Sequence, residues 1–210
     1  MELKKVAEAL RHKHYEVHIA EDSEEARAIV KDLLKGVKSI GKGGSQTLRQ
    51  SGIWDDLLYY DSLEGDDRIE LFSTTSYKAK GLDPDIALRK GMTADAYICS
   101  VNSMSEDGTI YNVDGIGNRV GAIIYGPRKV IFVVGRNKIH RTKEEAWDHL
   151  RNVICPKHCI TNKKPNPCVK VGRCVDCSLE TMECKVTSKL SYALPNREYI
   201  VVLVNEDLGY

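Results

Sequence analysis

The chain has 210 residues, and its 31 lysines and arginines nearly balance 30 aspartates and glutamates, which leaves a formal net charge of +1. This balance argues against a nucleic-acid-binding or membrane-surface protein, because those classes usually carry a basic excess. A hydrophobic content of 42% supports a packed core and excludes wholesale disorder. The length predicts one sizeable domain, or one domain with a small module.

The N-terminus and the apolar segments indicate the compartment. No segment reaches the ~18 consecutive apolar residues of a membrane-spanning helix, so no membrane insertion is expected. Residues 1–5 lead into a mixed-charge amphipathic pattern rather than the apolar centre of a signal peptide. We therefore predict a cytoplasmic protein whose thiols stay reduced.

Helix and strand patterns alternate along the chain. In chain order the sequence predicts a helix near 3–10, a strand at 15–20, a helix at 23–34, strands at 37–40 and 69–73, a helix at 84–90, a strand at 94–100, a helix at 116–124, a strand at 129–135, a helix at 142–153 and a strand at 199–204. The continuous apolar run at 129–135 is typical of a strand covered on both faces. The alternation predicts an α/β fold with a mainly parallel sheet and helices on both faces.

A glycine-rich segment follows the strand predicted at 37–40. Its candidate ligand-binding residues are Gly41, Gly43, Gly44, Ser45 and Thr47. Glycines permit close backbone approach, and free N–H groups at a helix start favour an anion. The segment has neither the Gly-Lys-Ser/Thr ending of a P-loop nor the Gly-x-Gly-x-x-Gly dinucleotide pattern. It is therefore either a site for a small carboxylate or phosphate, or a tight turn with a helix cap.

Polar residues also gather after the strand predicted at 94–100, where parallel sheets bind ligands. Glu106 and Asp107 are the candidate catalytic groups, as acid/base or nucleophile, and Arg119 is a candidate clamp for carboxylate or phosphate. The full candidate ligand-binding set in this region is Asn112, Asp114, Gly115, Gly117, Asn118 and Arg119. The Asp-Gly pairs at 107–108 and 114–115 are also compatible with plain turns.

Clustered cysteines form the third candidate site. The proposed metal ligands are Cys168, Cys174, Cys177 and Cys184. Four reduced thiolates suit an Fe–S cluster, such as a 4Fe–4S cluster, and they equally suit tetrahedral zinc, so the spacing leaves both open. A thioredoxin-like redox pair at 174 and 177 would leave the neighbouring cysteines unexplained.

The remaining cysteines have different expected roles. Cys155 and Cys159, with His158 between them, are either further ligands or incidental. Cys99 falls in a predicted strand and is expected to be a small core residue. Prolines and the lack of apolar periodicity predict that 155–189 is a loop-rich, cysteine-rich insertion in a single domain spanning 1–210, with 190–210 returning to the core sheet.

The combination of motifs resembles one known family, the LUD-domain proteins of the lactate-utilisation (LutC/YkgG-like) group. The resemblance covers nearly the whole chain, and its motifs are specific when taken together. They are the segments 41–47, 93–96, 102–108, 112–120, 126–138 and 205–210, together with the cysteine spacing from 168 to 184.

The resemblance implies a fold and a role. The fold is a three-layer α/β sandwich like that of the NagB/RpiA/CoA-transferase group, with a ligand cleft at the strand ends. The role is oxidation of lactate or related organic acids beside iron–sulfur redox partner proteins. The cysteines place the chain with a branch of the family in which an Fe–S centre is suspected.

Two functions of different classes are therefore open, besides a binding protein in which zinc only staples the cysteine loop. The first is an accessory redox protein that carries an Fe–S centre and binds a small anionic ligand. The second is a sugar-phosphate or acyl-CoA-type transferase or isomerase, in which zinc only staples the cysteine loop. No fingerprint for NAD, flavin or PLP is present, and no reaction follows from the residues alone.

Overall fold

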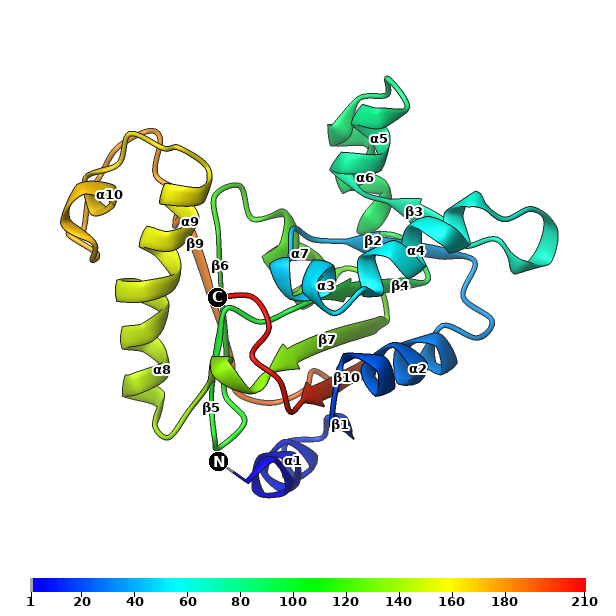
Figure 1. Ribbon diagram of the computed structural model, residues 1–210, viewed down its shortest axis with the longest axis horizontal. Helices are drawn as coiled ribbons and strands as arrows, with labels where there is room; N and C mark the ends of the chain where they lie inside the picture. The colour runs from blue at the N-terminus through cyan, green and yellow to red at the C-terminus, as the bar shows by residue number, and fades with distance from the viewer. Residues whose placement is uncertain (1) are drawn as a thin grey trace.

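The core of the fold is a parallel sheet, seen in a computed structural model that describes residues 2–210 (Figure 1). Its strands are β1 (Glu16–Ala20), β2 (Ser39–Lys42), β3 (Glu70–Phe72), β4 (Ala96–Cys99), β7 (Lys129–Gly135) and β10 (Glu198–Val204). They lie in the order β1-β10-β7-β4-β2-β3, and every neighbouring pair is parallel. The strand that ends the chain thus inserts between β1 and β7.

Strand β7 is buried from both sides, as its continuous apolar run predicts. Val130, Phe132 and Val134 face one core cluster, while Ile131 and Val133 face the other. All five side chains are fully buried. Side chains alternate across a strand, so an apolar residue at every position is stable only where both faces are covered.

Different layers cover the two faces of the main sheet. One face packs against helices α2 (Ser23–Leu33), α3 (Gln46–Gln50) and α4 (Ile53–Ser62). The other packs against α1 (Leu3–His12), α7 (Asn118–Tyr125) and a second sheet. The pieces near β3 are the short helix η1 (Gly65–Asp67), α5 (Thr74–Ala79) and α6 (Pro84–Gly91). The mainly parallel sheet with flanking layers confirms the predicted three-layer α/β sandwich.

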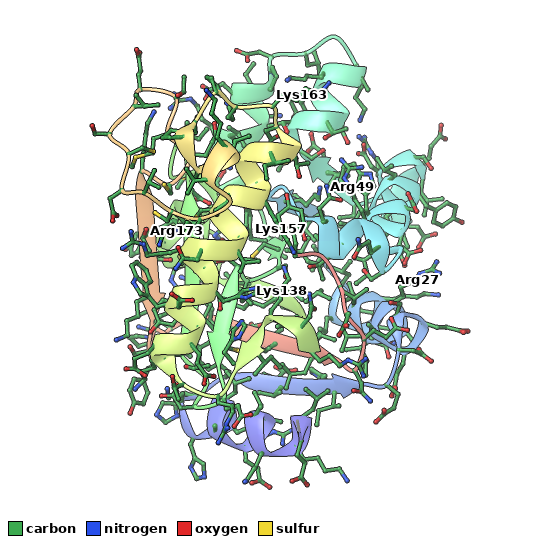
Figure 2. The ribbon with its side chains drawn as sticks, turned by 60° about the vertical axis from the view of Figure 1, so that its left-hand side comes forward. Arg27, Arg49, Lys138, Lys157, Lys163 and Arg173 are labelled. Carbon is green, nitrogen blue, oxygen red and sulfur yellow. The ribbon has the colours of Figure 1, made fainter. Side chains whose placement is uncertain are left out.

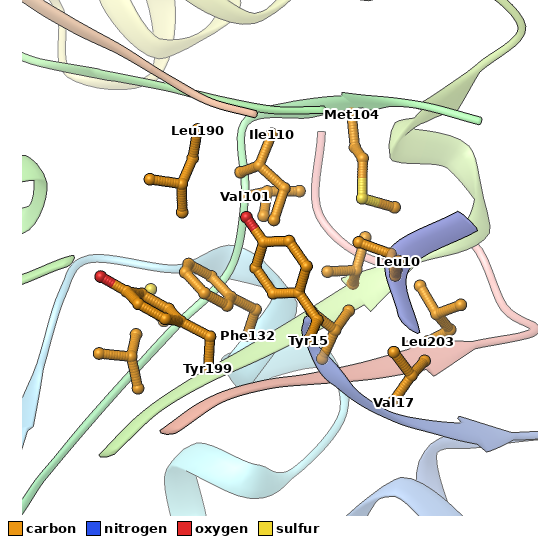
Figure 3. Packing of buried hydrophobic residues seen from close by; sticks show 14 of the residues in the cluster. Leu10, Tyr15, Val17, Val101, Met104, Ile110, Phe132, Leu190, Tyr199 and Leu203 are labelled. Carbon is orange, nitrogen blue, oxygen red and sulfur yellow. The ribbon is translucent and has the colours of Figure 1, made fainter. Parts of the chain in front are cut away.

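Aromatic residues fill the core between the two sheets (Figure 3). Phe132 stacks on Tyr199 with ring centroids 6.1 Å apart, and Tyr15 meets Tyr199 edge-on at the same distance. The Tyr199 hydroxyl donates to the carbonyl of Ile123 at 2.6 Å, which satisfies a buried polar group. This contact fixes α7 over the main sheet.

The second sheet is not predicted by the sequence. It contains β5 (Ser103–Ser105), β6 (Ile110–Asp114), β8 (Ile139–His140) and β9 (Val186–Leu190), in the order β8-β5-β6-β9. Strands this short and polar give almost no periodic signal. Its outer face packs against α8 (Lys143–His149) and the segment that follows.

The helix predicted to end near 153 continues further. After α8 comes one π-helical turn, Leu150–Ile154, and then α9 (Cys155–Thr161), so these elements form a long helical arm beside β6 and β9 (Figure 1). Ala146, Leu150 and Ile154 keep one apolar face of the arm on Tyr111. Pro156 lies in the first turn of α9, and a wider turn before it accommodates the missing proline N–H. The predicted loop-rich insertion therefore contains two helices, α9 and α10 (Pro167–Val171).

No helix within residues 2–210 is long and apolar enough to cross a membrane.

Candidate functional site

A cleft of about 870 Å³ opens where the parallel strands end. Its lining comes from the glycine-rich segment after β2, residues 100–102 after β4, residues 113–116 and 118–119 where β6 leads into α7, and Lys138 after β7. Ligands in open parallel sheets bind beyond the carboxyl ends of strands, so the position agrees with the fold. The arm formed by α8 and α9 closes the opposite wall. We refer to this space as the cleft.

The glycine-rich segment divides into structural residues and cleft residues. Gly43, Gly44 and Ser45 line the cleft, but Gly41 and Thr47 do not. A Cβ at Gly41 would lie 2.5 Å from the carbonyl oxygen of Gly91, so this glycine lets β2 pack against α6. Thr47 is fully buried and its hydroxyl donates to the carbonyl of Leu208 at 3.2 Å.

Ser45 also caps a helix. Its hydroxyl oxygen accepts the backbone N–H of Leu48 at 3.2 Å, which satisfies a free donor at the start of α3. The two interpretations of this segment from the sequence are therefore compatible. The segment is a capped turn, and its middle residues face a cavity.

Arg119 is held rigidly at the cleft wall. Its guanidinium donates to Asp114 at 3.1 Å, to the Asn102 side chain at 2.6 Å and to the carbonyl of Val113 at 2.8 Å. Asp114 also accepts the backbone N–H of Val120 at 2.6 Å. Asp114 and Arg119 were each predicted from the sequence as ligand-binding residues. They form a nearly buried ion pair whose charges largely offset each other.

The other predicted ligand residues have mixed positions. Gly115 and Asn118 line the cleft. Gly117 does not, and it begins α7 with φ of +79°, a left-handed conformation that glycine adopts readily. Asn112 is fully buried outside the cleft lining, and its side-chain oxygen and nitrogen have no partner among residues 2–210.

Glu106 and Asp107, the catalytic candidates, lie outside the cleft lining. Asp107 accepts hydrogen bonds from Ser105 and Thr109 and pairs with Lys13 at 3.1 Å and Lys143 at 3.0 Å. Burial alone would raise the pKa of Asp107, but these donors outweigh it and hold the pKa far below its usual range. The geometry gives Asp107 a structural role, joining the β5–β6 turn to α1 and α8.

Two buried lysines, Lys42 and Lys138, face the cleft instead, and neither is in the candidate ligand-binding sets given above. Lys138 is only 5% exposed and donates to the Ser100 hydroxyl at 3.2 Å and to the carbonyl of Val101 at 3.0 Å (Figure 2). Within residues 2–210 no carboxylate forms an ion pair with it. Burial, assisted by the charge of Arg119, lowers the pKa of Lys138 to about 7. Its only sequence signal is its position three residues after a strand buried on both faces.

Lys42 is the second buried cation. It is 7% exposed, and its ammonium lies 3.8 Å from the ring centroid of Trp54. Burial first, and then the charge of Arg49, lowers the pKa of Lys42 to about 8. Cation–π contact offsets part of the cost of burying this charge, but no carboxylate in the described chain pairs with it. Lys42 and Lys138 make the cleft electropositive, which favours an anion.

The C-terminal segment completes the floor of the cleft. Leu208 accepts from Thr47, the N–H of Gly209 donates to the Gln50 side chain at 2.6 Å, and Tyr210 lines the cavity. In Figure 1 this red segment runs between the main sheet and the helical arm. It ties α3 to the residues that follow β7.

The cysteine cluster shares this cleft. The thiol-bearing residues of its wall are Cys155, Cys159, Cys168, Cys174, Cys177 and Cys184. Cys99 is fully buried in the core, as predicted. Within residues 2–210 no three cysteine, histidine, aspartate or glutamate side chains converge on one point as a ready metal site. The donor set nevertheless fits an Fe–S cluster or zinc, because all six are soft thiol ligands and three of them, Cys174, Cys177 and Cys184, lie on a segment, 172–185, without helix or strand.

Positive charge reaches the thiols as well. Arg151, on the arm, donates to the sulfur of Cys174 at 3.2 Å and pairs with Asp176. Arg151 thus adds positive charge on the side of the cleft where the cysteines lie.

These features define an α/β sandwich protein with one cleft shared by buried cations and clustered thiols. The sequence profile of the LUD domain matches residues 3–204, so the chain belongs to the LUD-domain family, as its motifs suggested. None of the curated proteins compared with the chain matches it. Among solved structures, a DUF162 family protein from Deinococcus radiodurans is similar at 15% identity, with a TM-score of 0.48, over 96% of this chain and 95% of that one.

The two glycines of the turn are expected to differ in their tolerance of a side chain. Gly41→Ala should reduce the free energy of unfolding by about 1–3 kcal/mol, because the new methyl group overlaps the backbone of Gly91. Gly44→Ala is the matched control, since a Cβ there meets nothing within 4 Å. Urea unfolding of both variants measures the difference, and equal stability would contradict the structural role of Gly41.

Burial of the charged Lys138 side chain is expected to lower the free energy of unfolding by an amount that depends on pH. Its pKa is about 7 in the folded chain against an ordinary value of 10.5, so the cost is full below pH 7 and declines as pH rises toward 10.5. The stability gained by Lys138→Met relative to the parent should therefore shrink over that range. Thermal unfolding at several pH values measures it, with Lys78→Met, at an exposed position, as control. A difference independent of pH would show that Lys138 is not buried with its charge.

Proposed function

We propose that this protein is an accessory redox component in the utilisation of lactate or a related organic acid. In this proposal Cys168, Cys174, Cys177 and Cys184 hold an Fe–S cluster, and the cleft binds a small organic anion. Membership of the LUD-domain family supports a role connected with lactate utilisation. The protein acts in the cytoplasm, where thiols stay reduced, and passes electrons to iron–sulfur partner proteins.

One observation carries the proposal: thiols and unpaired cations line the same cavity. An Fe–S cluster supplies one-electron chemistry at a potential that the surrounding charges and hydrogen bonds adjust. A ligand bound by Lys138 or by the turn at Gly43 and Gly44 would lie in the space that the thiols also face.

The residues of the chain have distinct roles in this arrangement. Lys42 and Lys138 offset the negative charge of the ligand, since no carboxylate among residues 2–210 pairs with either lysine. The turn at Gly43 allows close approach because it carries no side chain and rests on Arg119. The Arg119–Asp114 pair keeps the wall in place. Arg151 offsets thiolate charge beside Cys174.

The transferase or isomerase alternative has less support. It depends on Glu106 or Asp107 acting on a ligand held at the glycine-rich turn. Both residues lie outside the cleft lining, and Asp107 is engaged with two lysines. Zinc in place of iron remains a distinct outcome of metal analysis.

The metal half of the proposal is tested by anaerobic purification. We expect a brown protein with iron and acid-labile sulfide, a charge-transfer band in the visible spectrum, and an EPR signal after reduction. The double variant Cys174→Ser/Cys177→Ser should lose most of the iron, whereas Cys99→Ser, which removes a core thiol, should retain it. A colourless protein containing one equivalent of zinc would favour a structural metal. Absence of both metals would refute the metal assignment.

The ligand half is tested by calorimetric titration with lactate and pyruvate. Wild type should bind one or both, and Lys138→Met should bind severalfold more weakly because the anion loses its nearest unpaired cation. Binding should also weaken as pH rises above 7, since Lys138 then loses its proton. Glu106→Gln is the control and should bind as wild type does, because Glu106 lies outside the cleft lining. Unchanged binding by Lys138→Met would remove this residue from the site.

A further inference from the structure

Helix α9 carries two cysteines whose role the sequence leaves open. Cys155 and Cys159 are four residues apart, so they lie one turn apart on the same face of the helix. Both line the cleft, and Cys159 is only 3% exposed. A helix holds two such thiols at a fixed separation and on one side, whereas a flexible loop does not.

These thiols lie on the same cleft wall as the cysteines of the proposed metal site, Cys168 and Cys184 among them. The neighbouring Cys184 and then burial raise the pKa of the Cys155 thiol, while burial and then Cys168 raise the pKa of Cys159. The helix thiols are therefore interleaved with the loop thiols rather than separate from them.

Ion pairs hold the helix and the loop in this alignment. Glu183, next to Cys184, pairs with Lys164 at 2.5 Å and with His158 at 3.5 Å. Arg151, one turn before Cys155, bridges to Cys174 and Asp176. These contacts, near both ends of α9, reach the segment 174–184. Several independent interactions therefore hold the cysteines of α9 beside that segment.

We infer that helix α9 supplies Cys155 and Cys159 as ligands to the same metal centre as Cys168, Cys174, Cys177 and Cys184, which makes it a six-thiol site anchored on a helix. The inference rests on the proposed function, because it concerns the same centre. Thiolates that share one cavity repel one another, and a bound metal supplies an opposing charge. Six thiols exceed the four that one cubane or one zinc ion requires, so the helix thiols can share or replace loop ligands.

Protection mapping on the wild-type protein provides the first test. The anaerobically purified protein and its chelator-treated form are alkylated with iodoacetamide, and each cysteine is quantified by mass spectrometry. Cys155, which is partly exposed, should react severalfold more slowly in the metal-loaded form, in parallel with Cys184. Cys99 should be unreactive in both forms because it is fully buried. Free alkylation of Cys155 while Cys184 is protected would overturn the inference and leave the proposed function standing.

Variants provide the second test, which also covers the buried Cys159. Cys155→Ser and Cys159→Ala should each change the visible and EPR spectra of the loaded protein and speed the loss of metal to a chelator. Cys99→Ser is the matched thiol control, and circular dichroism verifies that each variant is folded. Spectra identical to wild type in both variants would overturn the inference. A Cys155–Cys184 disulfide in the purified protein would also overturn it, whereas a wild type without metal would refute the proposed function itself.

Discussion

Burial of the parallel sheet on both faces is the constraint on which the rest of this structure depends. Parallel strands need crossover connections, so their carboxyl ends all emerge at one edge and the intervening segments gather there. Lys42 ends β2, Ser100 follows β4, and Lys138 follows β7, and all three therefore line one cleft. The apolar runs of β7 and β10 hold that edge in place, while the polar residues beyond them are free to serve a ligand. The second sheet adds the wall that carries the α8–α9 arm.

The unpaired lysines buried in the cleft lower the stability of the fold, and this cost indicates that they have a function. A buried ammonium without a carboxylate partner costs free energy, and burial accordingly lowers the pKa values of Lys42 and Lys138. Asp107, by contrast, sits among lysines and hydroxyls that stabilise its charge. A charge that is already paired within the protein is stabilised little by a ligand. An unpaired buried cation, in contrast, is stabilised when an anion binds from solution. This contrast separates the structural acid from the ligand-facing lysines.

The sequence predicted the main sheet well because its strands carry strong apolar runs, and the one at 129–135 was correctly assigned to a strand covered on both faces. It did not predict the second sheet, since strands such as Ser103–Ser105 are too short and polar for a periodic signal. Glu106 and Asp107 were selected because they follow a strand, yet both lie outside the cleft lining, and Asp107 is paired with Lys13 and Lys143. Lys138 was not selected because burial of a lysine is decided by tertiary packing. The six cysteines were identified by clustering alone, while their arrangement around a helix required the structure.

The shared cleft imposes an electrostatic condition on the proposed function. A thiolate-ligated centre and an organic anion both carry negative charge, and they repel each other at short range in a poorly solvated cavity. Lys42, Arg49 and Lys138 line that cavity without a carboxylate partner among residues 2–210, so their charges are available to both. Arg119 is not, since Asp114 already offsets it. Anchoring part of the centre on α9 would hold the thiolates against the helical arm, opposite the lysines at the sheet edge. The cations would then occupy the side of the cleft where the proposed anion would bind, and the two negative groups could share one cavity.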